Sequence, residues 1–274
     1  MVLARSTGTI DLHSHVLPGI DDGAPDMATA VAMARQAGAM GVSRIVATPH
    51  VDHVYDTRAA TIRSAVAVLN EQLAREAIPV EVLPGAEVAV QRLADLGERE
   101  LRQLGLGGGP YLLIEAPLSP AAGDLELMPY DPRVRPRRIV LAHPERCPTL
   151  QREPERLKRM VLDGVVVSIT AASLSGRFGG TVRRFAISLL EGGMVHNVAS
   201  DMHDLSGRRP GISEHLRGLS TTLPGAVELE GWLTREVPAA VLAGRPVELP
   251  PELERSRRRA HRIGWALRGG RGAS

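Results

Sequence analysis

The sequence has very little cysteine, with only Cys147 among 274 residues. A single cysteine excludes an internal disulfide framework and any zinc site built from several thiolates. Aromatic residues make up only 3% of the chain, so a surface that stacks nucleic-acid bases on aromatic rings is not expected. No apolar run approaches the roughly 18 residues of a membrane-spanning helix, and the first residues lack the apolar centre of a signal peptide. These absences favour a cytoplasmic protein.

The formal net charge of +2 conceals an uneven distribution. Residues 255–274 carry seven arginines and no acid, whereas the rest of the chain has 26 basic and 31 acidic residues, a net charge of −5. Such a tail could contact nucleic acid, an anionic membrane surface or an acidic partner; a solvated, partly helical extension is the simpler interpretation. We expect no specific nucleic-acid partner, and peripheral membrane contact remains open. The predicted organisation is one domain over 1–250 and an Arg-rich tail over 251–274.

Short apolar, β-branched runs alternate with Ala-, Leu- and Arg-rich stretches of helical period. The runs predict strands at 9–15, 43–50, 80–88, 111–118, 137–145, 164–170 and 194–203. The stretches predict helices at 26–40, 57–77, 91–105, 151–163, 178–191 and 211–219. This alternation indicates a single α/β domain of parallel strands joined by crossovers, and closure into a barrel would remove the sheet edges. The segment 119–136, with four prolines, is expected to be a long loop, either a plain surface insertion or a lid.

Polar residues that could carry chemistry end six of the predicted strands. The first such stretch, DLHSHVLPGIDDG at 11–23, is ambiguous by itself, because His-x-His pairs also occur on solvated strand faces. The C-terminal ends of parallel strands in a barrel lie on one face, which turns six weak signals into one expected cluster. Its candidate members are His13, His15, Asp22, His50, Glu87, Glu115, His143, Asp201 and His203.

These residue types indicate a metal site. Mixed nitrogen and oxygen donors without thiolate suit Mn, Fe, Zn or Co, and suit Mg or Ca less well. Clustered carboxylates also need nearby cations, because like charges resist joint ionisation. Residues i and i+2 of a strand point to the same side, so His13 and His15 can bind one ion or serve two adjacent ions, as can Asp201 and His203. We therefore predict a multinuclear centre.

Three aspartates of the first stretch have different expected roles. Asp22 lies in the turn after the strand and can reach over the mouth of the site. Asp21 beside it is expected to cap the following helix. Asp11 is expected to support the two histidines that follow it.

Seven segments resemble the PHP (polymerase and histidinol phosphatase) superfamily of metal-dependent phosphoesterases. Within it, the chain is most similar to the bacterial manganese-dependent protein tyrosine phosphatases of capsule and exopolysaccharide loci. The segments are DLHSHVLPGIDDG, IVATPHV, LPGAEV, LLIEAP, LAHPERC, ITAASLSGRFGG and VHNVASDMH. The resemblance covers about residues 10–205, more weakly to about 245, and implies a distorted (β/α)7 TIM-like barrel. It also implies three divalent ions, with Mn²⁺ expected and Fe, Co, Zn or Mg as alternatives.

The resemblance assigns a role to each matching position. It implies three ligands of the first ion, which are His13, His15 and Asp201. It implies that Glu87 bridges the first and second ions. It implies further ligands of the second ion, Glu115 and His143, and three of the third, Asp22, His50 and His203. It implies two phosphate-facing arginines, Arg146 and either Arg208 or Arg209.

The implied activity is hydrolysis of phosphotyrosine on a bacterial tyrosine kinase that controls polysaccharide synthesis. Clustered divalent ions make hydroxide at neutral pH by lowering the pKa of bridging water, and arginine binds the non-bridging oxygens. A tyrosine leaving group, with a pKa near 10, needs little protonation help. One alternative is a small-molecule phosphatase of the same superfamily, such as a histidinol phosphatase. Another is a noncatalytic binding module, against which the complete set of candidate ligands argues.

The remaining candidates receive simpler interpretations. Cys147 is expected to pack, because no CxxxxxR phosphate loop surrounds it. The stretch SLSGRFGG (173–180) resembles a phosphate cradle, but a turn that opens the next helix is preferred because it lacks the ending of a P-loop. Of the other histidines, His53 on the loop after the second predicted strand could touch substrate. His196 is expected to be structural, and His215 and His261 are expected to lie on the surface. The Arg-rich tail and the proline-rich segment depart from the family pattern.

Overall fold

The architecture is described from a computed structural model of the chain. It describes residues 8–119, 125, 128, 131 and 137–248. The predicted loop 119–136 therefore lies largely outside the described residues, and the tail 251–274 lies wholly outside them. Across the described part of the chain, no helix has both the length and the apolar character to cross a membrane.

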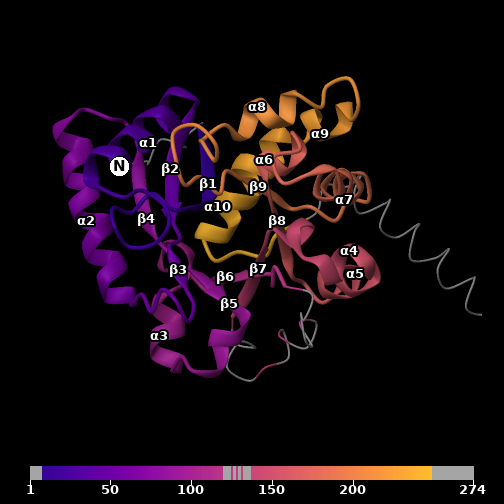
Figure 1. The fold of residues 1–274 in the computed structure, drawn as a ribbon, viewed down its shortest axis with the longest axis horizontal. Helices are drawn as coiled ribbons and strands as arrows, with labels where there is room; N and C mark the ends of the chain where they lie inside the picture. Colours follow the sequence, from indigo (N-terminus) through magenta and orange to yellow (C-terminus); the bar gives the residue numbers. More distant parts are fainter. Residues whose placement is uncertain (1–7, 120–124, 126–127, 129–130, 132–136, 249–274) are drawn as a thin grey trace, which may run out of the picture.

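All strand pairs are parallel, and they form two sheets (Figure 1). The first sheet, in the order β1-β2-β4, comprises β1 (Thr9–Ser14), β2 (Val42–Ala47) and β4 (Glu81–Pro84). The second, in the order β3-β5-β6-β7-β8-β9, comprises β3 (His50–Val51), β5 (Glu87–Ala89), β6 (Tyr111–Glu115), β7 (Arg138–Ala142), β8 (Val166–Thr170) and β9 (Asn197–Ala199). The six residues of β1 and the five of β8 are all buried, as expected for strands covered on both faces.

The two sheets are parts of one barrel wall. Two residues, Thr48 and Pro49, separate β2 from β3, and two more separate β4 from β5. The Glu87 N–H donates to the Pro49 carbonyl at 3.1 Å, which bridges this break. A proline has no N–H for a sheet ladder, so Pro49 explains why one predicted strand divides into two.

The other edge closes through β1 and the residues after β9. The His15 N–H donates to the Met202 carbonyl at 2.9 Å, and the Asp201 N–H donates to the His13 carbonyl at 2.9 Å. The chain thus makes seven strand passes around a distorted barrel, which confirms the predicted fold. This closure places the end of β9 beside the end of β1, two segments far apart in sequence.

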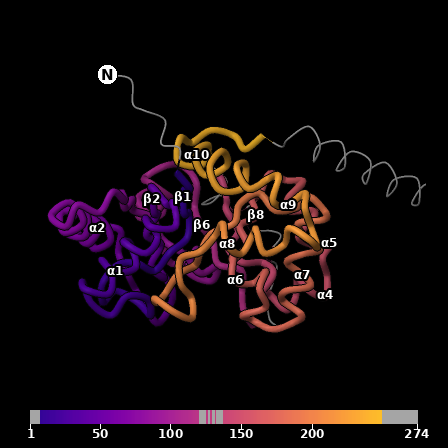
Figure 2. The backbone as a smooth tube through the Cα atoms, turned by 90° about the horizontal axis from the view of Figure 1, so that it is seen from above, coloured from indigo at the N-terminus to yellow at the C-terminus, as the bar shows by residue number. Residues whose placement is uncertain are grey.

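Helices flank the strands, with α1 and α2 on one side and α4, α5 and α7 on the opposite side (Figures 1 and 2). The first half of the chain contains α1 (Met27–Ala39), α2 (Ala59–Arg75), the 3-10 turn η1 (Val90–Ala94), α3 (Glu98–Gln103) and η2 (Leu106–Gly108). The second half contains η4 (Pro144–Arg146), α4 (Pro148–Arg152), α5 (Pro154–Leu162), α6 (Ala171–Leu174), α7 (Gly180–Glu191), α8 (Ile212–Arg217), α9 (Pro224–Glu228), the π-helical η5 (Trp232–Glu236) and α10 (Val237–Leu242).

Several predicted helices differ from the observed ones in instructive ways. The prediction at 151–163 merges α4 and α5, which Glu153 separates with an extended φ of −128°, because a residue before proline avoids the helical region. The prediction at 91–105 merges η1 and α3. No element was predicted after residue 219, although α9, η5 and α10 lie there.

The N-cap of α1 is Asp26 and not a member of the preceding aspartate pair, Asp21 and Asp22. The Asp26 carboxylate accepts a hydrogen bond from the Thr29 N–H at 2.8 Å, a normal N-cap contact. The prediction that Asp21 caps this helix is therefore wrong, and Asp21 lies instead against His15, as described next.

Candidate metal centre

The carboxyl ends of the strands bring the predicted polar residues together at one end of the barrel. Six of the nine residues are buried: His13, His15, Glu87, His143, Asp201 and His203. The other three lie nearer the surface, which are Asp22, His50 and Glu115. Three overlapping groups have candidate ligand atoms within 4.8 Å of one another. The sequence therefore identified residues that share one site.

The most buried of these groups comprises His13, His15 and Glu87, and Asp201 lies against it. His13 Nε2 lies 3.1 Å from His15 Nε2, and Glu87 Oε2 lies 3.3 and 3.4 Å from these nitrogens. Asp201 Oδ1 lies 3.4 and 3.5 Å from the same pair. Four ligands placed about 2.1 Å from one ion are separated by roughly 3.4 Å when tetrahedral. The spacing therefore fits one divalent ion.

Glu87 extends this group toward a second one. Its Oε2 atom faces His13 and His15, while its Oε1 atom lies 2.7 Å from His143 Nε2. Glu115 falls within a ligand group with His50 and Glu87. Burial and the charge of Glu87 raise the pKa of Glu115 to about 8, so a cation bound beside these two carboxylates would favour their joint ionisation.

The third group lies nearest the mouth. Asp22 Oδ1 is 3.4 Å from His50 Nε2, 3.4 Å from His203 Nε2 and 4.0 Å from His15 Nδ1. Contact with His203 holds the pKa of Asp22 below its usual value, so this carboxylate is ionised. Asp22 is 47% exposed, and its carboxylate accordingly lies between the buried histidines and solvent.

Several buried donor and acceptor atoms of this cluster have no hydrogen-bond partner among the described residues. They are His50 Nδ1, Glu87 Oε2, His143 Nδ1, Asp201 Oδ1 and His203 Nε2. An unsatisfied buried polar atom is costly, about 1–3 kcal/mol, and more when it is charged. Orphaned atoms concentrated in one donor cluster are what metal ligands would leave, so the residues present fit divalent ions.

Two aspartates support the histidines from outside the cluster. Asp21 Oδ2 lies 2.6 Å from His15 Nδ1 and accepts from the His50 N–H at 3.1 Å. A carboxylate behind a ligating histidine fixes the ring and its tautomer. Asp11 accepts hydrogen bonds from the Ser200 N–H at 3.0 Å and from its hydroxyl. It therefore ties β1 to the loop that carries Asp201, and its predicted support of the two histidines stays a prediction.

The turn that carries Asp21 and Asp22 requires glycine next to them. A Cβ atom on Gly23 would lie 2.0 Å from the His15 carbonyl oxygen, which no real side chain tolerates. The Ala24 N–H donates to that carbonyl at 3.0 Å. The loop thus folds back tightly onto His15 and brings both aspartates to the ligand cluster.

Backbone conformation is unusual at two candidate ligands. His143 has φ +32° and Asp201 has φ +52°, two of three non-glycine residues with positive φ in the described chain. This left-handed region is disfavoured for residues with a Cβ and is found preferentially at functional sites. The conformation turns each side chain into the mouth immediately after its strand.

Two arginines contact Asp201 on its other oxygen. Arg146 Nη1 lies 3.1 Å and Arg208 Nη2 lies 2.6 Å from Asp201 Oδ2, and the Thr170 hydroxyl donates to the same atom at 3.2 Å. Burial alone would raise the pKa of Asp201, but His13 and Arg208 hold it well below its usual value. We refer to Arg146 and Arg208 as the arginine pair.

Of the two alternatives for the second arginine, only Arg208 joins this cluster. Arg209 binds both oxygens of Glu214 at 2.8 Å. The turn that presents Arg208 is closed by Asp204, whose carboxylate accepts from the Ser206 and Arg208 N–H groups at 2.6 and 3.1 Å.

The sequence did not single out Glu145, although the HPER motif contains it. Its buried carboxylate accepts hydrogen bonds from the Thr170 N–H at 2.9 Å and the Ser173 hydroxyl at 2.7 Å. Burial raises its pKa to about 7. Glu145 thus joins the loop after β7 to the start of α6.

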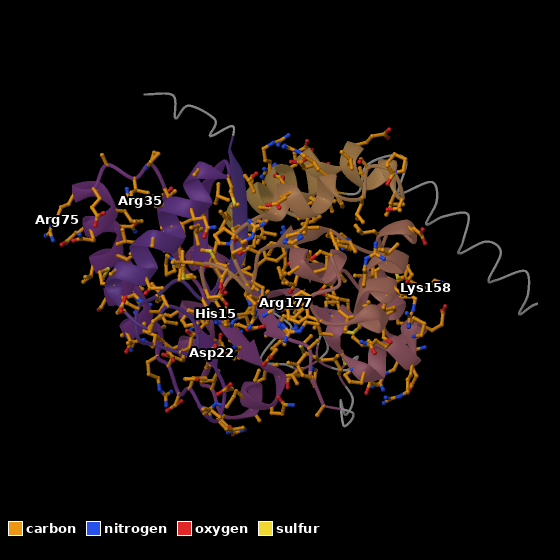
Figure 3. The ribbon with its side chains drawn as sticks, turned by 45° about the horizontal axis from the view of Figure 1, so that its top comes forward. His15, Asp22, Arg35, Arg75, Lys158 and Arg177 are labelled. Carbon is orange, nitrogen blue, oxygen red and sulfur yellow. The ribbon has the colours of Figure 1, made fainter. Side chains whose placement is uncertain are left out.

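Most of the remaining candidates lie outside the ligand groups. Cys147 is buried. His196 accepts a hydrogen bond from the Val167 N–H at 3.1 Å and lies near Trp232, so it is structural. His53 is exposed on the loop after β3, while His215 lies on α8 and His261 outside the described residues. In Figure 3, His15 and Asp22 lie centrally, whereas Arg35, Arg75 and Lys158 lie at the edges of the view.

Comparison with protein families identifies relatives over most of the chain. Residues 9–226 match a family described as capsular polysaccharide synthesis, CpsB/CapC. The tyrosine-protein phosphatase YwqE of Bacillus subtilis is 39% identical over 202 residues, which cover 73% of this chain and 79% of that protein. The tyrosine-protein phosphatase CpsB of Streptococcus agalactiae serotype III is 27% identical over 213 residues, covering 75% and 87%.

A solved structure agrees with these sequence matches. It belongs to work on YwqE from Bacillus subtilis and CpsB from Streptococcus pneumoniae, described as unique metal-dependent tyrosine phosphatases. It superposes with a TM-score of 0.75 at 34% sequence identity and covers 88% of this chain and 97% of that chain. The chain therefore shares its fold with that structure over most of both chains.

Proposed function

Because the chain belongs to the CpsB/CapC family of capsular polysaccharide synthesis and is a metal-dependent tyrosine phosphatase, we propose that its nine clustered side chains bind three divalent ions. The observation that carries this proposal is the overlap of the ligand groups. His15 belongs to two of the three groups, and so do His50 and Glu87. Shared ligands are what closely spaced ions require, and one isolated ion would not need them.

The proposed division of ligands follows the family resemblance. The first ion takes His13, His15 and Asp201, with Glu87 between the first and second. The second takes Glu115 and His143, and the third takes Asp22, His50 and His203. Such ions, when bound, supply a water of lowered pKa and neutralise phosphate charge. We propose Mn²⁺ as the natural ion, while the same donors also suit Fe, Co or Zn.

The protein's own residues then bind and orient the phosphate. Arg146 and Arg208 are 16% and 21% exposed, so each can donate to a phosphate oxygen while it remains beside Asp201. Asp21 keeps the His15 ring oriented through its Nδ1 atom. Tyrosinate is a good leaving group with a pKa near 10, so the site needs no strong general acid beside the ester oxygen.

We propose that the natural substrate is a phosphotyrosine protein of the polysaccharide pathway, such as a tyrosine kinase that controls capsule synthesis. The relatives' names and the family description support this choice. A cytoplasmic location and tail contact with an anionic membrane stay predictions of the sequence.

A substrate comparison tests this function. Metal-stripped protein is reconstituted with Mn²⁺ and assayed on a phosphotyrosine peptide, a phosphoserine peptide and histidinol phosphate. We expect kcat/KM for phosphotyrosine to exceed the others by at least about tenfold, because an aryl oxygen leaves more readily than an alkyl oxygen. Equal rates on histidinol phosphate would instead support a small-molecule phosphatase, and no turnover of any ester would support a binding module.

A further inference from the structure

A single aromatic ring lies against the arginine pair. The guanidinium carbon of Arg146 is 4.4 Å from the centroid of the Phe178 ring, and that of Arg208 is 5.9 Å from it. Both distances lie within the roughly 6 Å over which a ring face attracts a cation. The chain has only two phenylalanines, and the other, Phe185, packs against the hydrophobic core. The ring at 178 is half-buried beside the site instead.

The two guanidinium groups of the arginine pair repel each other, and the attraction of each group to an aromatic ring can offset that repulsion. Two cationic groups converge on one oxygen atom, Asp201 Oδ2, and therefore repel each other. One nitrogen of each guanidinium lies against that oxygen, and a contact through one nitrogen fixes the guanidinium plane less than a two-nitrogen contact does. The face of an aromatic ring carries negative potential, so it attracts both cations and limits their rotation.

The loop that carries Phe178 is held in place by its own contacts. The Arg177 N–H donates to the Ala172 carbonyl at 3.2 Å, and the Gly179 N–H donates to the Gly176 carbonyl at 3.0 Å. The loop also leans on the turn before Arg208, because a Cβ on Gly207 would lie 2.8 Å from Arg177 Nη2. Figure 3 shows Arg177 in the same central region as His15 and Asp22. The stretch 173–180 thus runs from the end of α6 through a turn into the start of α7, as preferred from sequence.

From this geometry we propose that Phe178 is a positioning residue for phosphate binding. Its ring keeps the two guanidinium groups oriented so that their remaining N–H groups face the phosphoryl oxygens. The residue acts through Arg146 and Arg208, and it need not touch the tyrosyl part of the substrate. This inference rests on the proposed phosphatase function.

The test replaces the ring by an aliphatic side chain in the Mn²⁺-loaded enzyme. Phe178→Leu is expected to raise KM by about three- to tenfold for both p-nitrophenyl phosphate and a phosphotyrosine peptide. The kcat value should change by less than about threefold. The dissociation constant of inorganic phosphate, measured by calorimetry, should rise by the same factor as KM.

Two matched variants separate the ring effect from a packing effect. Phe178→Tyr keeps the aromatic face and should hold KM within about twofold of the native value. Phe185→Leu makes the same substitution in the core, so it should lower thermal stability without changing phosphate affinity. If Phe178→Leu folds poorly, Phe178→Met replaces it in the same measurements.

A double-mutant cycle tests the coupling directly. Arg146→Lys keeps the charge but loses the planar group that stacks. Adding Phe178→Leu to Arg146→Lys should raise KM by less than Phe178→Leu does in the native background.

Three outcomes would overturn the proposal: unchanged phosphate affinity in Phe178→Leu, a rise in KM for the peptide alone, or additive effects in the cycle. The peptide-only result would mean that the ring contacts the tyrosyl or peptide part. A native enzyme without turnover would refute the proposed function instead. Phosphate calorimetry does not depend on turnover, so it would still decide the role of Phe178.

Discussion

The two sides of the catalytic mouth differ in how their charges are balanced. The ligand side, built by β1 to β6 from His13, His15, Asp22, His50, Glu87 and Glu115, leaves His50 Nδ1 and Glu87 Oε2 without a hydrogen-bond partner among the described residues, and the pKa of Glu115 is raised to about 8. The arginine side, with Arg146, Arg208 and Phe178, has both guanidinium groups paired with Asp201 and 4.4 and 5.9 Å from the centroid of the Phe178 ring, although Arg208 Nε has no hydrogen-bond partner among the described residues. The first side therefore offers oxygen and nitrogen donors that cations would balance, whereas the second offers two cations that an anion would balance.

Asp201 belongs to both sides, so its loss should have the largest effect. Its Oδ1 atom faces His13 and His15, while Oδ2 binds the arginine pair. We expect Asp201→Ala to lower kcat/KM for a phosphotyrosine peptide by more than about 1000-fold, because metal charge stabilisation is worth several kcal/mol. Folding is checked by circular dichroism. Asp204→Ala, which disturbs only the turn before Arg208, serves as the comparison and should lose far less.

Removing one proposed ligand should weaken metal binding and leave the arginine pair in place. His13→Ala is expected to lower kcat/KM by up to about 1000-fold with the fold retained, and to lower the bound metal measured by elemental analysis. His215→Ala on α8 is the matched control and should keep both metal and turnover. Full activity in His13→Ala would refute the proposed ligand set.

Removing one arginine should lower kcat/KM less than removing one proposed metal ligand does. Arg208→Ala is expected to lower kcat/KM by about 100-fold without loss of metal, because a charge-assisted contact to phosphate disappears. Arg209→Ala provides an adjacent control, since Arg209 pairs with Glu214. Similar losses in both variants would contradict the distinction drawn between these arginines.

The hydrogen bond behind His15 should tune the ligand side by a smaller amount. Asp21→Asn is expected to weaken metal affinity about 10- to 100-fold, so that excess Mn²⁺ restores most of the turnover. The measurement is a Mn²⁺ titration of activity. A defect that excess metal leaves unchanged would show that Asp21 acts otherwise.

The smallest expected effect lies outside the mouth. Asp26→Ala removes the N-cap of α1 and should lower the free energy of unfolding slightly. Denaturant unfolding measures this loss, while Mn²⁺ affinity should not change. A change in metal affinity would mean that the cap at Asp26 also influences the preceding turn, which carries Asp21 and Asp22.

The sequence predicted the ligand side better than the arginine side. The ligands follow apolar strands, and the parallel α/β pattern requires strand ends to meet on one face. The contact of Asp21 with His15 was not predicted, because an aspartate shortly before a helix commonly serves as its N-cap. The local contact that decided it, between Asp21 and His15, appears only once Gly23 folds the loop back.

The arginine side depends on contacts that no periodicity encodes. Phe178 and Arg208 lie 30 positions apart, and only the packing of two loops brings them together. The choice between Arg208 and Arg209 likewise needed the position of Glu214. The breaks in the predicted helices were more accessible, because Pro154 directly disfavours a helical Glu153.

The most direct test of the central claim is a crystal structure of the Mn²⁺-loaded protein with anomalous scattering measured at the manganese edge. The account predicts three anomalous peaks within the cluster, bordered by His13, His15, Asp22, His50, Glu87, Glu115, His143, Asp201 and His203. A single peak, or peaks outside this cluster in an active enzyme, would contradict it.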